Sequence, residues 1–310
     1  EKTKLEAFAD GQTMQKRQSP KRKKSNKQES VQKKFKTTRQ KKEQPRPAVI
    51  LEHFTDKIEE EYNVIFKPNV GPQTDFLAAS EREVLYGGSA GGGKSYAMLA
   101  DPLRYMGNPA FSGLLLRHTT EELRELITKS QEMYPKIWPG IKWSERKMQW
   151  TAPSGAKLWL SYLDKDQDVT RYQGLAFSWI GFDELTQWGT PFAWNYMRSR
   201  LRTADPELPL SMRATTNPGG RGHGWVKKMF IDPAPAGKSF IATEIETGEQ
   251  LKYPAGHAKA GKPLFKRRFI PARLKDNPYL AEQGDYEAML LSLPEQQRRQ
   301  LLDGDWDIKE

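Results

Sequence analysis

The sequence predicts an α/β fold with a mainly parallel central sheet and helices on both faces. Helical patterns separate short apolar runs, and a glycine-rich stretch joins the first run to a helix-forming segment. Strands that alternate with helices form parallel sheets, because each helical crossover returns the chain to the same edge. Four runs have the length and composition of buried strands: residues 84–86, 113–117, 177–182 and 211–216.

Composition places the chain among folded, soluble proteins. It has 310 residues, 36% of them hydrophobic, with 9 Trp and 13 Phe, which suffices for one large domain or two smaller ones. Cysteine is absent, which excludes disulfides and thiolate metal sites and suits a reducing compartment. The 4 histidines are scattered without metal-ligand spacing. No run approaches the ~18 apolar residues of a membrane span, so we expect a soluble intracellular protein with no membrane partner.

Positive charge is concentrated at the start of the chain. Residues 1–47 hold 16 of the 50 Lys and Arg residues but 5 of the 39 Asp and Glu residues, a net charge of +11 that equals the whole chain's. The segment lacks tryptophan and nearly all aliphatic side chains, so we expect a disordered tail. It is either an electrostatic arm for nucleic acid or an acidic partner, or a solubilising extension. A helix is expected at residues 51–62.

The clearest motif is a phosphate-binding loop. Residues 88–95 match the pattern G-x-x-x-x-G-K-[ST], with a strand-like run before them and helix-forming residues 96–100 after them. Glycines let successive backbone N–H groups surround a phosphate without Cβ clashes, and the following helix directs the positive end of its dipole at the same anion. A flexible glycine-rich turn is the alternative, which we disfavour because all eight positions and both flanks match.

The residues of the loop are predicted to have different roles in binding nucleotide and metal. Lys94 should reach the β- and γ-phosphates of ATP, and the Ser95 hydroxyl should bind Mg²⁺. A second Gly-Lys-Ser, at residues 237–239, is not such a loop, because Asp232 stands where the first glycine is needed. The remaining residues of the true loop are predicted to bind nucleotide: Gly88, Ser89, Ala90, Gly91, Gly92 and Gly93.

The second apolar run leads into a helix and then a hairpin. Residues 121–134 have the period of an amphipathic helix, and Thr119 or Thr120 is suited to cap its amino end. Residues 148–150 and 156–162 alternate with period two on either side of a Pro-Ser-Gly turn, which predicts a β-hairpin.

A single arginine precedes the third apolar run. Arg171 is close enough to that strand to lie at the rim of the site or of a subunit interface. A multimeric ATPase needs a cation to stabilise the charge of the transition state, and Arg171 is a candidate for this role in a neighbouring subunit's site. The alternative is a solvated surface arginine without a catalytic role.

Two carboxylates follow the third apolar run directly. Hydrolysis of a nucleotide needs a carboxylate to hold Mg²⁺ and a group that orients or deprotonates water. Asp183 would emerge at the end of the strand beside the phosphates and is predicted to bind Mg²⁺. Glu184, one residue farther along, is predicted to be the general base. An acidic pair that merely starts a turn is the alternative, disfavoured in a chain with a complete phosphate-binding loop.

The fourth apolar run ends in small polar side chains. Thr215, Thr216 and Asn217 are suited to sense whether a γ-phosphate is present, although such residues also occur in ordinary turns. Because ligands of parallel sheets bind at the carboxyl ends of strands, we expect these residues close to the phosphate-binding loop.

Four features in this order resemble the ATPase domain of the large terminase subunit, the motor of tailed-phage DNA packaging. They are Gln73, the loop at residues 88–95, the Phe-Asp-Glu at residues 182–184 and the Thr-Thr-Asn at residues 215–217. The resemblance spans roughly residues 66–308, including a Gly-Pro-Gln-x-x-Phe-Leu segment at residues 71–77 and a Leu-Leu-Asp-Gly-Asp-Trp segment near the end.

The resemblance implies a P-loop NTPase fold of the RecA-like (ASCE) type and a set of roles. Gln73 would contact adenine, Lys94 and Ser95 the phosphates and Mg²⁺, Asp183 the metal and Glu184 the attacking water. Thr215, Thr216 and Asn217 would couple hydrolysis to movement. This loop lacks the arginine found in many relatives, so that cation must come from elsewhere, which draws attention to Arg171.

Domains and partners follow from the same resemblance. Residues 48–262 would be the ATPase domain, and residues 263–310 a helical lid or linker leading toward a nuclease domain that is not expected in this chain. The partners would be double-stranded DNA, the portal protein, the small terminase subunit and further copies in a ring. The motor would act in the host cytoplasm, docked on the procapsid portal, and be missing from the mature virion. Candidate DNA-backbone contacts are basic residues at 221–224, 266–268 and 298–299.

Two other classes of function remain open from the residues alone. A helicase-like NTPase or a nucleotide kinase uses the same loop, the kinase with an acceptor pocket in addition. A basic-tailed module that binds nucleic acid and nucleotide without turnover is the non-enzymatic alternative.

Overall fold

The computed structural model describes residues 66–308 of the chain. The predictions of a disordered tail at residues 1–47 and a helix at residues 51–62 lie outside the described residues. No helix in the described part is long and apolar enough to span a membrane.

A nine-stranded sheet forms the centre of residues 66–308, in the order β3-β4-β5-β2-β6-β7-β1-β9-β8. Strands β5, β2, β6, β7, β1 and β9 run parallel, whereas β3, β4 and β8 are antiparallel additions at the two ends. This confirms the predicted α/β class. The strand bounds are β1 Glu83–Gly88, β2 Ser112–Arg117, β3 Lys142–Ser144, β4 Gln149–Thr151, β5 Lys157–Tyr162, β6 Trp179–Phe182, β7 Ser211–Thr216, β8 Ser239–Ile241 and β9 Lys266–Ala272.

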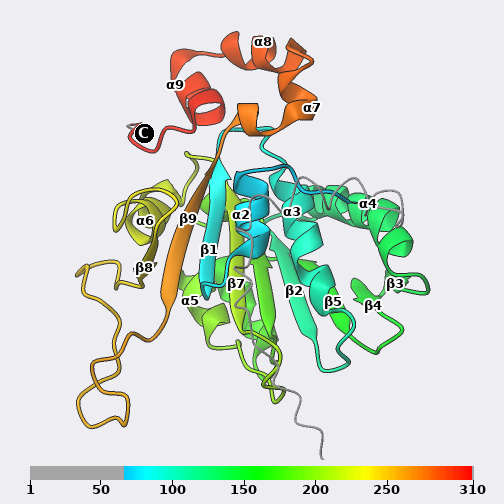
Figure 1. The fold of residues 1–310 in the computed structure, drawn as a ribbon, viewed down its shortest axis with the longest axis vertical. Coiled ribbons are helices and arrows are strands. Elements are labelled where there is room, and N and C mark those ends of the chain that lie inside the picture. The colour runs from blue at the N-terminus through cyan, green and yellow to red at the C-terminus, as the bar shows by residue number, and fades with distance from the viewer. Residues whose placement is uncertain (1–65, 309–310) are drawn as a thin grey trace, which may run out of the picture. The chain divides into compact units, whose positions relative to one another are not determined.

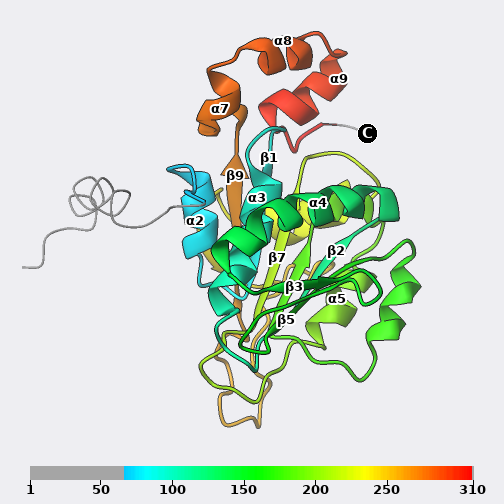
Figure 2. The ribbon, with the colours of Figure 1, turned by 90° about the vertical axis from the view of Figure 1, so that its right-hand side faces the viewer.

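Helices cover both faces of the sheet (Figures 1 and 2). One face carries α2 (Pro72–Ala78), α3 (Lys94–Ala100), η1 (Asp101–Tyr105) and α4 (Thr120–Ile137). The other carries α5 (Phe192–Arg198), α6 (His223–Val226) and η4 (Lys227–Ile231). Short turns η2 (Asp166–Tyr172) and η3 (Leu185–Gln187) flank β6. Thr119 caps α4, because its hydroxyl accepts from the Glu122 N–H while the Glu122 carboxylate accepts from the Thr119 N–H.

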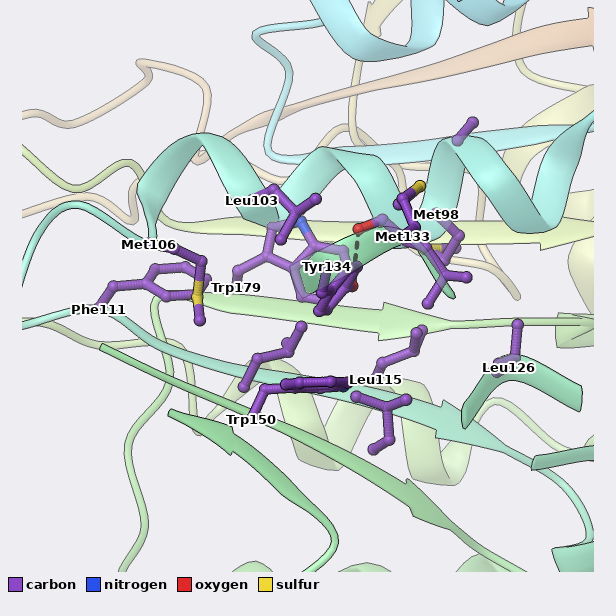
Figure 3. Packing of buried hydrophobic residues seen from close by; sticks show 14 of the residues in the cluster. Met98, Leu103, Met106, Phe111, Leu115, Leu126, Met133, Tyr134, Trp150 and Trp179 are labelled. Carbon is purple, nitrogen blue, oxygen red and sulfur yellow. Dashed lines mark hydrogen bonds between the residues drawn. The ribbon is translucent and has the colours of Figure 1, made fainter. Parts of the chain in front are cut away.

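Each central strand is buried on both sides, which explains why the strands appear as continuous apolar runs. Val84 and Tyr86 of β1 pack in the core beneath α2, α3 and α4, whereas Leu85 points into the opposite core. Figure 3 shows Met98, Tyr134 and Trp179 among the side chains of the first core. A rigid sheet packed on both faces therefore supports the loops at its edges.

The carboxyl ends of the six parallel strands lie at one edge of the sheet. Registers such as Gly87↔Thr216 and Leu116↔Phe182 align the ends of β1, β7, β2 and β6. Residues that follow these strands therefore meet at the same edge, as the sequence predicts for the phosphate-binding loop and the two carboxylates.

Strand β9 lies in the segment that we expected to be wholly helical. It pairs with β1 in parallel from Arg267 to Ala272, and only then does the chain form the short helices η5 (Leu274–Asp276), α7 (Pro278–Ala281), α8 (Asp285–Leu291), α9 (Glu295–Arg298) and η6 (Arg299–Asp303). The division of the chain at residue 262 stays a prediction.

One candidate DNA contact is wrong. Arg267 is 1% exposed, and its guanidinium pairs with the buried Glu83 carboxylate at 2.6 Å, so it is unable to reach a polyanion outside the molecule. It is a structural residue of β9 that binds the first residue of β1.

Candidate functional site

The phosphate-binding loop lies between β1 and α3 and depends on glycine at two positions. Gly88 has φ 137°, and a Cβ there would lie 2.3 Å from the Ala272 carbonyl oxygen of β9. Gly93, which begins α3, has φ 72°, and a Cβ there would lie 2.8 Å from Gln73 Nε2. Other residues would be strained in this left-handed backbone and would also clash with these neighbours. The close packing fixes the loop at the carboxyl edge of the sheet.

Lys94 is buried inside this loop. Its Nζ donates to the Ser89 carbonyl oxygen at 2.7 Å and to Asn217 Oδ1 at 2.8 Å. Burial lowers the pKa of the ammonium group, while the carboxylates of Glu184 and Asp183 act in the opposite direction. The contact with Asn217 brings the predicted coupling segment, at the end of β7, directly to the loop lysine.

Asp183 follows β6 and is completely buried. Arg117 Nε, at the end of β2, lies 2.9 Å from its Oδ2 atom, and the Thr215 hydroxyl donates to its Oδ1 atom. These partners come from the strands on either side of β6 and hold the carboxylate in one orientation. Thr215 therefore contacts the predicted metal ligand.

Glu184 has an unusual backbone conformation for a residue with a side chain. Its φ of 61° is left-handed, which costs on the order of 1–3 kcal/mol and persists where the surrounding structure enforces it. Burial raises the pKa of its carboxyl group, and the Asp183 charge raises it further, whereas Lys94 and Arg117 lower it. The result is a strained, half-buried carboxyl group with greater affinity for protons than an exposed one.

One cavity of about 360 Å³ brings several predicted residues together. The loop forms one wall from Ala90 to Ser95, and Glu184 and Asn217 line the same cavity. Arg117, Asn277 and Leu280 lie around it as well. The cavity therefore joins the loop, the predicted base and the coupling segment with a C-terminal element.

Gln73 lies behind the loop, on α2. Its Nε2 donates to the Gly93 carbonyl oxygen at 2.9 Å, and its Oε1 accepts from the Asn69 N–H at 2.6 Å. The side chain is 4% exposed. Its position against the loop is thus defined, and its contact with adenine stays a prediction.

Arg171 lies outside the lining of the cavity. Its guanidinium is 3.4 Å from Asp168 and 5.6 Å from the ring centre of Tyr162, at the end of β5. The side chain is 41% exposed. It is accessible at the edge of the molecule, and its action on a neighbouring subunit stays a prediction.

Thr216 connects β7 to the turn after Glu184. Its hydroxyl and that of Thr186 are 2.7 Å apart, and the Thr186 N–H also donates to the Thr216 hydroxyl at 3.2 Å. Movement at the end of β7 would therefore displace η3, which begins directly after the predicted base.

Sequence reasoning missed several residues of the cavity, and two of them, Arg117 and Asn277, contact predicted site residues. The sequence could have identified Arg117 as a site residue, because a charged residue at the end of an apolar run is the same pattern that identifies Asp183. Asn277 had no local signal. Its Nδ2 donates to the Gly91 carbonyl oxygen at 2.6 Å only because β9 returns the chain to the loop. The Ala90 N–H likewise donates to the Leu301 carbonyl oxygen at 2.6 Å.

The donor set suits Mg²⁺. The Ser95 hydroxyl lines the cavity, and the fixed Asp183 carboxylate lies next to Glu184 in the chain; both groups offer hard oxygen atoms. Within residues 66–308 no group of three or more His, Cys, Asp or Glu side chains is placed to hold a metal. Mg²⁺ bound with nucleotide needs only one or two protein ligands, since phosphates and waters complete its shell.

A glycine-rich loop between a strand and a helix, with carboxylates after another parallel strand of the same sheet, defines the P-loop NTPase class. Strand β7 separates the loop strand β1 from the carboxylate strand β6, as in the RecA-like (ASCE) type. The chain belongs to the family described as terminase large subunit, T4likevirus-type, N-terminal, whose model matches residues 85–308.

Solved structures share this fold. The large terminase of the thermophilic bacteriophage D6E, in complex with ADP, is 15% identical with a TM-score of 0.54, over 77% of this chain and 54% of that chain. A variant of the Thermus phage P74-26 large terminase ATPase domain is 12% identical with a TM-score of 0.50, over 81% and 98% of the two chains. The chain thus spans about half of the D6E protein. No match was found among curated proteins.

Proposed function

We propose that this chain is the ATPase part of a large terminase subunit, which hydrolyses ATP to move double-stranded DNA into a viral procapsid. The observation that carries the proposal is the meeting of Lys94, Glu184 and Asn217 at one cavity walled by the phosphate-binding loop. Family membership indicates the biological setting, and the D6E structure with ADP supports nucleotide binding.

In this proposal, residues of the chain bind the phosphates of ATP and activate the attacking water. Backbone N–H groups of the loop and the Lys94 ammonium bind the β- and γ-phosphates. Glu184 takes a proton from a water molecule as the water oxygen bonds to the γ-phosphorus; the bond to the β-phosphate oxygen breaks and leaves ADP and phosphate. The raised pKa of Glu184 suits a group that must accept a proton. Mg²⁺, held by Ser95 and Asp183, would neutralise charge on the phosphates.

Asn217 and the end of β7 respond to the reaction in this scheme. Lys94 already donates to Asn217, so phosphates that attract the ammonium group would compete with that hydrogen bond. Thr215 and Thr216 connect the same strand end to Asp183 and η3. A change at the γ-phosphate would thereby reach two elements beyond the cavity.

The remaining features of the proposal concern assembly. Copies form a ring in which Arg171 supplies a cation to the neighbouring site, and the ring docks on the portal protein in the host cytoplasm with the small terminase subunit as a partner. The mature virion lacks the motor. The proposal assigns ATP hydrolysis and translocation to these residues and places DNA cleavage outside them.

Replacing the predicted base tests the catalytic assignment. We expect Glu184→Gln to lower the rate of ATP hydrolysis by about 10²- to 10⁴-fold, the usual contribution of a general base, while ATP still binds. Glu125→Gln is the matched control, because Glu125 lines the same cavity but has an exposed carboxylate paired with Lys129. Phosphate release and equilibrium ATP binding are measured for both. Hydrolysis by Glu184→Gln at the parental rate would exclude this residue as the base.

A further inference from the structure

An arm extends from the sheet between β8 and β9. We define the β8–β9 arm as residues 242–265, the yellow-to-orange loop that projects away from the sheet in Figure 1. It begins and ends at the amino end of β9, because Ile241 of β8 pairs with Lys266 of β9. The arm therefore leaves the edge of the sheet opposite the phosphate-binding loop.

The arm has a defined conformation along its length. Antiparallel bridges join Thr243 to Gln250 and Lys252 to Pro263. At the tip, the Tyr253 N–H donates to the Lys262 carbonyl oxygen at 2.9 Å, and the Tyr253 carbonyl oxygen accepts from the Gly261 N–H at 3.0 Å. The arm is thus a folded hairpin-like element, able to hold side chains at fixed positions.

The tip of the arm carries positive charge without any acidic residue. Residues 250–266 contain four lysines and no Asp or Glu. Three of the lysines are exposed at the tip, and within the described part of the chain none of the three pairs with a carboxylate: Lys252, Lys259 and Lys262. The acidic residues of the arm, such as Glu244, lie before the tip in the chain. An uncompensated basic surface of this kind attracts a polyanion.

We propose that the tip of the β8–β9 arm binds the phosphate backbone of double-stranded DNA. Lysine ammonium groups bind phosphates as point charges and do not read sequence, which suits a motor that moves any sequence. The inference rests on the proposed function in one respect, since double-stranded DNA is the polyanion that a packaging motor meets.

The tip is less suited to bind a protein or single-stranded nucleic acid, the other two partners that a basic surface could attract. A protein partner requires large side chains that fill its pockets, and the tip consists mainly of Lys, Gly, Ala and Pro. Single-stranded nucleic acid stacks its bases on aromatic rings. The Tyr253 ring already packs on the His257 imidazole, with ring centres 4.5 Å apart, and lies 5.7 Å from Lys259 Nζ.

Strand β9 connects this surface to the nucleotide cavity. It runs from Lys266, next to the arm, to Ala272, whose carbonyl oxygen accepts from the Ser89 N–H of the loop at 2.8 Å. A force on the arm would therefore act on a strand that pairs with β1 from Arg267 to Ala272. The two sites lie at opposite ends of β9 and are joined by this one strand.

Salt-dependent DNA binding tests the proposal. The full chain is compared with a triple variant, Lys252→Ala, Lys259→Ala and Lys262→Ala, by fluorescence anisotropy with a mixed-sequence duplex between roughly 50 and 200 mM salt. We expect weaker binding and a slope of log K against log salt that is smaller by about 3, about 1 for each lost phosphate contact. Replacing the same lysines with arginine should preserve both affinity and slope.

A second triple variant controls for net charge. Lys142→Ala, Lys147→Ala and Lys157→Ala remove three exposed charges around β3, β4 and β5, at the other end of the sheet. Equal losses of affinity and slope in the two triple variants would overturn the proposal. Unchanged DNA binding by the arm variant would also overturn it, and is the result expected if the arm binds an acidic protein instead. A loss confined to the arm variant supports it. If the loss is confined to the arm variant but the parental chain does not hydrolyse ATP, the proposed function is wrong and the assignment of DNA binding to the arm still holds.

Discussion

Lys94 is buried and Glu184 is half-buried, and the environment of each opposes its ionised form. Burial lowers the pKa of the lysine and raises that of the glutamate, and each group offsets part of the effect on the other. Isolated buried charges are costly, so such groups persist where they serve a ligand or each other. Together with the left-handed backbone of Glu184, they place strain at the cavity.

Arg171 gives the sharpest prediction about assembly at the residue scale. Because the loop contains no arginine and Arg171 lies outside the cavity, we expect the guanidinium to act in a neighbouring subunit. Arg171→Ala should lower ATP turnover of the assembled ring by about 10³-fold or more, the usual contribution of such an arginine. In mixtures with parental chains, the variant should reduce turnover beyond simple dilution.

The control for this experiment is Arg124→Ala, which removes an exposed arginine from α4. Mixtures containing it should lose no turnover. If Arg171→Ala mixtures instead follow dilution alone, Arg171 does not act between subunits and the required cation lies elsewhere, with Arg117 in the cavity as the first candidate.

The sequence predicts those site residues that follow a local pattern. The spacing of Gly, Lys and Ser in the loop is specific to phosphate binding, and Asp183 and Glu184 directly follow an apolar run. The sequence therefore predicts that the loop and the two carboxylates lie at the same edge of the sheet. Asn277 could not be, because its contact with Gly91 joins positions that no pattern relates and depends on the return of the chain through β9. The Arg117 contact with Asp183 required knowledge that β2 and β6 are neighbours.

At the scale of elements, a buried ion cluster holds β1, β9 and α5 together. Glu83 of β1 is fully buried and pairs with Arg267 of β9 and Arg198 of α5. Burial alone would raise the pKa of Glu83, but the two guanidinium groups outweigh it and lower the pKa below its ordinary value of 4.5. The cluster lies at the amino ends of β1 and β9, next to the base of the β8–β9 arm.

Removing this carboxylate should destabilise the fold in a pH-dependent way. Glu83→Gln leaves two guanidinium groups without their partner, and we expect the free energy of unfolding near neutral pH to fall by about 3–5 kcal/mol. A lowered pKa stabilises the folded state above pH 4.5, and this contribution is lost as the pH falls through the lowered value. The difference between variant and parent should therefore shrink in acid.

Urea unfolding at a series of pH values measures this difference. Glu282→Gln, which changes an exposed carboxylate on the C-terminal side of α7, should unfold like the parent throughout. A Glu83→Gln protein as stable as the parent near neutral pH would show that the cluster does not join the three elements.

Strand β9 could not be predicted from the sequence. Its first residues are basic and Pro271 lies near its end, a composition that does not resemble a buried strand. Pro271 is tolerated because β8 covers only the first residues of β9, so no neighbouring strand needs the missing N–H on that side. The apolar runs of β1, β2, β6 and β7 are buried on both faces and were predictable for that reason.

At the scale of the whole molecule, the sheet has different chemistry at its two edges. The groups predicted to bind nucleotide gather at the carboxyl ends of the parallel strands, and the basic tip of the arm extends from the opposite edge. Net charge gave no hint of this, because residues 48–310 contain equal numbers of basic and acidic residues. The four lysines of residues 250–266 lie in a stretch without Asp or Glu, and only the fold shows that most of this stretch projects from the sheet as an arm (Figure 1).

The central claim is that this site hydrolyses ATP in a manner coupled to double-stranded DNA. The most direct measurement is the steady-state release of inorganic phosphate at saturating ATP and Mg²⁺, with and without duplex DNA of mixed sequence. The account predicts that DNA increases the rate and that Glu184→Gln lowers turnover by about 10²- to 10⁴-fold in both conditions. A rate unchanged by DNA that binds the chain, or transfer of the γ-phosphate to a nucleotide instead of water, would contradict it.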